Sequence, residues 1–165
     1  MVRVGSRIIH SLHGLGVVEA IEEKELLGRV TRFAVLAFDR LKIMVNTDQK
    51  NSMVRPLIPA EELARVMEHL RSCDTELPTN HTKRYNLNLE RVKSGNIYRL
   101  CEVVRSLIAL SKTKKLGLKD TQMLERSRRV LAEELSYVSE CDEDKMVHDI
   151  ELLAIAELDA AVSAG

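Results

Sequence analysis

The sequence has no tryptophan, few other aromatic residues and no long apolar run. Of its 165 residues, 3% are aromatic and 45% are hydrophobic, so a folded core has to be largely aliphatic. The longest apolar runs fall well short of the roughly 20 residues that a membrane-spanning helix needs. No apolar signal segment follows Met1. We therefore expect a cytoplasmic protein with no membrane partner.

Cysteine motifs and enzyme signatures are also scarce. The three cysteines, Cys73, Cys101 and Cys141, are far apart and form no C-x-x-C pair, which is typical of reduced thiols in the cytosol. The segment Gly14-Leu15-Gly16 lacks the third glycine of a dinucleotide-binding turn. Neither a P-loop nor a nucleophile elbow is present. These absences predict a protein that is not an enzyme.

His10 and His13 are the most metal-like pair of side chains in the sequence. Their three-residue spacing would let both imidazoles bind one ion only if the segment were helical, and the sequence shows no third ligand. We therefore predict no metal site and no cofactor.

Charge is balanced in total but unevenly distributed. The chain has 25 Lys and Arg residues against 25 Asp and Glu residues. From Glu133 onward nearly every charge is acidic, and we interpret these carboxylates as solvated helix faces. The middle of the chain is basic, through Lys112, Lys114, Lys115, Lys119, Arg126, Arg128 and Arg129. A neutral protein can thus present one cationic face.

Residues 1–58 contain most of the strand-forming side chains. Short β-branched and aromatic runs predict strands at residues 8–9, 17–21, 30–38 and 43–45, which suits a small barrel or a strongly bent sheet. The stretch 19–27 is ambiguous because it is rich in helix formers and Gly28 could cap a helix. We choose a strand because its neighbours are strands.

After Pro56 and Pro59 the apolar period becomes helical. Residues 60–165 contain five apolar stripes at helical spacing, which predict a compact bundle of about five helices. One helix should run from about residue 82 to 93, with Gly95 as its left-handed cap and Asn96 as the N-cap of the next. A polar loop is expected at 112–117, followed by Asp120 as a helix cap. The sequence thus predicts an α+β protein.

A basic segment opens the helical half. Over residues 78–96, Lys83, Arg84, Arg91 and Lys93 are opposed only by Glu90. A cationic cluster of this kind suits a polyanion such as the phosphates of nucleic acid. The alternative is an ordinary solvated helix face, which is what most charge runs are.

The joint order of several motifs resembles the CarD/CdnL family of bacterial RNA polymerase-binding regulators. The likeness covers nearly the whole chain, and the order of the motifs makes it specific. The matching segments are Val4-Gly5, Val17–Ile21, Lys42–Val45, Pro78-Thr79-Asn80, Lys83-Arg84-Tyr85, Ser94-Gly95-Asn96 and Glu102–Leu107.

The resemblance implies a Tudor-like domain at residues 1–58 that docks on the β subunit of bacterial RNA polymerase. It places Lys24 and Met44 where the family often has polymerase-contacting basic side chains. Lys24 keeps the positive charge, and Met44 does not. The alternative for Lys24 is an exposed turn lysine with no partner.

For residues 60–165 the resemblance implies contact with promoter DNA at the upstream edge of the melted bubble. His81 stands where the family has a tryptophan that is associated with wedging into the minor groove. An imidazole is smaller and less apolar, and a surface histidine that caps the helix start is the alternative. Lys83 and Arg84 match a basic pair that contacts phosphates. Arg126 and Arg129 would extend this DNA-binding patch, or simply solvate a helix.

We therefore predict a non-enzymatic transcription regulator that acts as a monomer. It would bind the open promoter complex more tightly than the closed one and so shift the population toward the open state. The alternative is an adaptor that binds polymerase without touching DNA, because the family tryptophan is missing.

Overall fold

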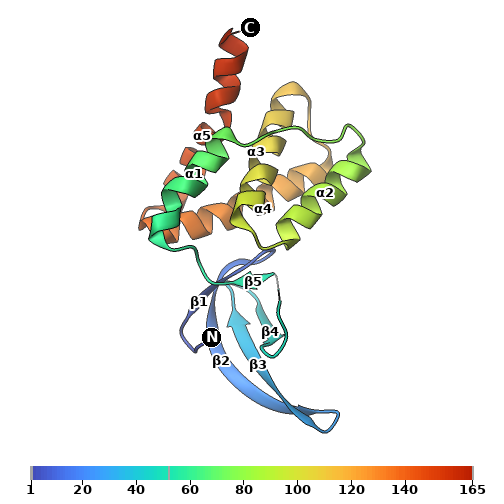
Figure 1. The fold of residues 1–165 in the computed structure, drawn as a ribbon, viewed down its shortest axis with the longest axis vertical. Coiled ribbons are helices and arrows are strands. Elements are labelled where there is room, and N and C mark those ends of the chain that lie inside the picture. Colours follow the sequence, from blue (N-terminus) through green and yellow to red (C-terminus); the bar gives the residue numbers. More distant parts are fainter. Residues whose placement is uncertain (1, 52, 165) are drawn as a thin grey trace.

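A β-sheet and a group of helices make up the protein, in that order along the chain. The computed structural model describes residues 2–51 and 53–164, and for residues 159–164 it describes the backbone alone. Figure 1 shows the sheet at one end of the molecule and the helices at the other. The predicted α+β class is therefore confirmed.

Among the residues that the structure describes, five antiparallel strands form the sheet, in the order β4-β3-β2-β1-β5. A bulge lies between Val18 and Ala20 on β2. Residues 19–26 belong to β2, so the choice of a strand over a helix for this stretch was correct. The two-residue strand β5 was not predicted. The strands are β1 (Arg7–His10), β2 (Gly14–Leu26), β3 (Arg29–Ala37), β4 (Lys42–Asn46) and β5 (Val54–Arg55).

Residues 53–164, as far as the structure describes them, contain a short 3-10 helix and five α-helices after strand β5. The predicted helix at 82–93 is present as α2, Gly95 follows it with a φ of 72°, and Asn96 caps α3 by accepting from the Tyr98 amide. The helices are η1 (Ala60–Glu62), α1 (Leu63–Ser72), α2 (His81–Lys93), α3 (Ile97–Thr113), α4 (Leu118–Ser139) and α5 (Glu143–Ala164).

Two details of the helical half differ from expectation. Helix α3 continues to Thr113, so the loop predicted at 112–117 is shorter. The N-cap of α4 is Gly117 and not Asp120, which lies inside the first turn and is buried. Asp120 has a partner far away in sequence, as described below, and this partner explains its position better than capping does.

Two clusters of buried side chains form the core. Ile8, Val18, Ala34 and Leu36 form a small cluster on one face of the sheet. The larger cluster lies among the helices and also includes Ile9 from β1. Because Ile8 and Ile9 are adjacent on a strand, they face opposite sides of the sheet. Strand β1 therefore contributes to both clusters and joins the sheet to the helices.

Candidate functional site

The sheet brings Lys24 and Met44 together. Lys24 lies on β2, Met44 lies on β4, and the Lys24 Nζ is 3.7 Å from the Met44 Sδ. Met44 pairs with Val35 across β3 and β4, and Lys24 pairs with Thr31 across β2 and β3. Cross-strand partners share a face of a sheet. Two residues that are 20 positions apart thus contribute to one surface.

This surface is the outer face of the sheet. Phe33 and Val35 alternate with the buried Ala34 and Leu36 along β3, so they lie on the face opposite the small core cluster. Both are partly exposed, and Met44 is 44% exposed. We call Lys24, Phe33, Val35 and Met44 the outer sheet face. It combines apolar area with one cation, a composition typical of protein–protein interfaces.

Helix α2 presents His81 and Lys83 to solvent. His81 is the first residue of the helix, and the Asn80 Oδ1 caps it by accepting from the Lys83 amide. Both side chains are exposed. The N-cap is thus Asn80, so His81 does not have the capping role considered as its alternative.

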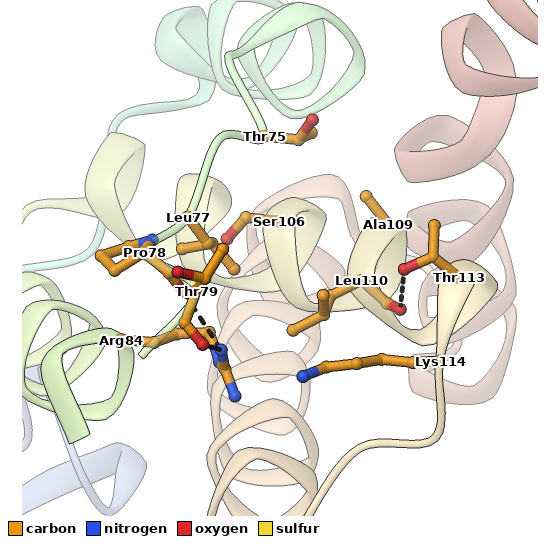
Figure 2. Close-up of a pocket in the computed structure, with 10 residues that line it drawn as sticks. All are labelled: Thr75, Leu77, Pro78, Thr79, Arg84, Ser106, Ala109, Leu110, Thr113 and Lys114. Carbon is orange, nitrogen blue, oxygen red and sulfur yellow. Dashed lines mark hydrogen bonds between the residues drawn. The ribbon is translucent and has the colours of Figure 1, made fainter. Parts of the chain in front are cut away.

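Arg84 lies inside the helical half, where only 4% of it is exposed. Its Nε and Nη2 are both 2.9 Å from the Asp120 Oδ2. Its Nη1 donates to the carbonyls of Pro78 and Thr79, as Figure 2 shows. All three guanidinium nitrogens therefore have protein acceptors. The expectation that Arg84 contacts phosphate needs correction, since this side chain instead ties α2 to α4 and to the preceding segment.

A row of basic side chains runs along α4. Lys119, Arg126 and Arg129 are exposed and are separated by seven and three residues, so they share one helix face. The Lys119 Nζ lies 5.1 Å from the centre of the Tyr85 ring on α2. This contact brings the start of α4 next to α2. Lys83 lies two residues from Tyr85, on nearly the opposite side of α2, so it is not part of this row. We call Lys119, Arg126 and Arg129 the cationic stripe.

The far end of the cationic stripe reaches the sheet. Burial lowers the pKa of His13, and the positive charges of Arg126 and Arg129 lower it further. Arg129 also pairs with Glu133 at 3.0 Å. Arg128 points elsewhere and pairs with Glu151 on α5. The positive charge of the stripe is therefore least neutralised near Lys119 and Arg126.

A cleft opens beside the start of α4. Its volume is about 540 Å³, and His81, Tyr85, Leu118 and Lys119 are among its lining residues. Leu118 is the first residue of α4 and is well exposed. An apolar side chain thus lines this cleft together with His81 and Lys119. Nothing in the sequence selected Leu118, because the exposure of a helix-start residue does not follow from periodicity.

Adjacent glutamates on α4 hold the sheet against the helices. The buried Glu134 accepts from Arg55 at 2.6 and 2.7 Å and from the Ile58 amide at 2.9 Å. Glu133 accepts from the Leu15 amide at 2.8 Å. The expectation that the acidic residues from Glu133 onward only solvate helix faces is therefore wrong for these two. Together they fix the orientation of the sheet relative to α4.

Comparisons with known proteins agree with this arrangement. The family model described as the CarD-like/TRCF RID domain matches residues 2–58, and the model described as the CarD C-terminal domain matches residues 65–151. The chain belongs to the CarD family. A relative from Bacillus subtilis (strain 168), named "Putative transcription factor YdeB", is 29% identical over 141 residues, which cover 84% of this chain and 92% of the relative.

Membership of the CarD family identifies the sheet as a Tudor-like domain, as expected, and places the chain in a family of transcription factors. The cationic stripe and the cleft belong to the CarD C-terminal domain, and the outer sheet face belongs to the RID domain. The two candidate surfaces therefore lie on different domains of the family.

His10 and His13 lie close together in this CarD-family protein, with ring centres 4.5 Å apart and the ring planes tilted by 31°. The His10 Nδ1 accepts from the amides of Leu12 and His13. Burial, with a smaller contribution from His13, lowers the pKa of His10 to about 4. One possible metal-binding nitrogen of His10 is therefore already used as an acceptor. Among the described residues there is no group of three or more His, Cys, Asp or Glu side chains suited to a metal ion.

No helix in the described part of the chain combines enough residues with enough apolar character to cross a bilayer.

Proposed function

We propose that this protein binds bacterial RNA polymerase through its outer sheet face and contacts promoter DNA through its cationic stripe. Residues 1–58 would form the polymerase-binding domain, with the β subunit as partner, and residues 60–165 the DNA-contacting domain. The observation that carries the proposal is that Glu133 and Glu134 on α4 hold the domain with the outer sheet face against the domain with the cationic stripe. Because the joint is buried and hydrogen-bonded, docking of the sheet would place the stripe at a defined distance from the polymerase.

The chemistry of each surface suits its proposed partner. Partly exposed apolar side chains around one lysine favour a protein surface, while an exposed row of Lys and Arg favours phosphates. Phosphate contacts position a protein on DNA without reading bases. Promoter choice would then come from polymerase. Tighter binding to the open than to the closed complex would lengthen the lifetime of the open complex. The role would be regulatory and not enzymatic.

Charge reversal on the stripe tests the DNA contact. In Lys119→Glu/Arg126→Glu we expect a shorter open-complex lifetime with unchanged binding to polymerase. A plot of the logarithm of the DNA-binding constant against the logarithm of the salt concentration should become less steep by about 2, because each phosphate contact contributes roughly 0.9 to the slope. Arg65→Glu is the matched control, since this exposed arginine on α1 lies outside the stripe.

One observation favours the adaptor alternative, in which polymerase is the sole partner. Arg84 is buried, and Arg128 and Arg129 are paired with carboxylates, so fewer cations remain for DNA than the sequence suggested. An unchanged lifetime and an unchanged salt slope in the double variant would establish the adaptor. Loss of polymerase binding in Lys24→Glu/Met44→Glu would still support docking through the outer sheet face.

A further inference from the structure

Strands β2 and β3 extend beyond the rest of the sheet as a two-stranded arm. Strand β4 pairs with β3 only from Phe33 to Ala37, and β1 pairs with β2 only as far as Val17. Between Lys24 and Thr31, strands β2 and β3 pair with each other. Figure 1 shows this arm projecting away from the helices.

The turn at the end of the arm contains a leucine in an unfavourable backbone conformation. Leu27 has a φ of 51°, and Gly28 has a φ of 74°. Two positive φ values are typical of a type I′ hairpin turn, where Asn-Gly is preferred. Glycine adopts this conformation readily, and a leucine rarely does. The sequence therefore places an apolar side chain where asparagine would suit the turn better.

The fold itself does not explain this leucine. Leu27 is 104% exposed, so packing within the described chain does not compensate for its conformation. Its neighbours Leu26 and Val30 are also exposed. We call Leu26, Leu27 and Val30 the apolar tip. Residues in rarely populated backbone conformations cluster at functional sites.

The apolar residues of the arm are concentrated at its end. The nearby positions are mostly charged, namely Glu22, Glu23, Lys24, Glu25, Arg29 and Arg32. These charges keep the arm solvated, which leaves the apolar tip as a small, defined contact element. Such an element suits insertion into an apolar recess on a partner.

We propose that the apolar tip inserts into an apolar recess of the RNA polymerase surface to which the outer sheet face docks. This inference rests on the proposed function. Leu26 and Lys24 are two residues apart on β2, so they lie on the same face of the arm, about 7 Å from each other. The Leu26 side of the apolar tip is thus continuous with the outer sheet face, whereas Val30 pairs with Glu25 and lies on the opposite face. The continuity through Leu26 selects polymerase over other partners.

Leu27→Asn separates binding from folding. Asparagine suits the positive φ, so thermal stability should be unchanged or higher. Affinity for purified core polymerase should fall about ten- to hundredfold, which is the value expected for one leucine that is buried on binding. Leu27→Met should retain binding, because it preserves the apolar side chain. Leu152→Asn is the matched control, since this exposed leucine lies on α5, away from the arm.

The remaining outcomes each decide a different question. Normal binding by Leu27→Asn, with loss of binding by Lys24→Glu/Met44→Glu, would overturn the role of the apolar tip and leave the proposed docking intact. Normal binding by both variants would overturn the docking of the outer sheet face and, with it, the role of the tip. Sedimentation that shows a wild-type dimer and a monomeric Leu27→Asn variant would identify the tip as a self-association surface and overturn the proposal.

Discussion

Replacing Glu134 by alanine should destabilise the protein more than any surface substitution on α4. The carboxylate is fully buried, and it accepts two hydrogen bonds from Arg55 and one from the Ile58 amide. Removing one partner of a buried ion pair costs about 3–5 kcal/mol. The Arg55 side chain remains 20% exposed and can recover some hydration, so we expect about 2–4 kcal/mol for this site.

Urea denaturation followed by circular dichroism measures this loss. Glu125→Ala is the matched control, because Glu125 is an exposed residue of the same helix. The variants Arg55→Ala and Arg55→Ala/Glu134→Ala complete a double-mutant cycle, in which the double variant should lose less than the sum of the two single ones. A loss below about 1 kcal/mol in Glu134→Ala, or simple additivity, would refute the view that this pair holds the two halves together.

Three further substitutions test other parts of the structure. Arg84→Ala should lower the free energy of unfolding by about 3 kcal/mol because it leaves Asp120 buried without its cation; a loss typical of a surface residue in denaturant titration would contradict this. Gly14→Ala should cost about 2 kcal/mol, since Gly14 has a φ of 81° and a Cβ would overlap the Glu133 carboxylate; an unchanged melting temperature would oppose that reasoning. Because the pKa of His10 is lowered to about 4, its contribution to stability is complete above about pH 6.5 and is lost as pH falls toward 4, by up to about 3 kcal/mol. The free energy of unfolding, measured by denaturation between pH 7 and 4, should depend less on pH in His10→Asn than in the wild type.

Local patterns in the sequence predicted the elements well. The helical spacing after Pro59 and the Gly95-Asn96 boundary were sufficient to place α2 and α3, because capping depends on neighbours within a few residues. The strand at 19–26 was harder, since its residues favour a helix and only pairing with β3 makes them extended.

The errors concern partners that are distant in sequence. Arg84 and Asp120 are 36 residues apart, and Arg55 and Glu134 are 79 apart. A charged residue in a polar run is usually solvated, so composition indicated exposure for Arg84 and Glu134. Only tertiary packing shows which charges are buried. In contrast, Lys24 and Met44, which the resemblance assigned to polymerase contact, lie against each other across the sheet, and their role stays a prediction.

Helix α4 joins the sheet, which is proposed to dock on polymerase, to Lys119, which is proposed to meet DNA, so the length of α4 sets the distance between these two ends. Lys119 and Glu134 are 15 residues apart, which corresponds to about 22 Å along a helix axis. In DNA this separation equals roughly six to seven base pairs at about 3.4 Å each. With the sheet docked on polymerase, one additional helical turn in α4 would displace Lys119 by about 5.4 Å and move its proposed contact to a different phosphate.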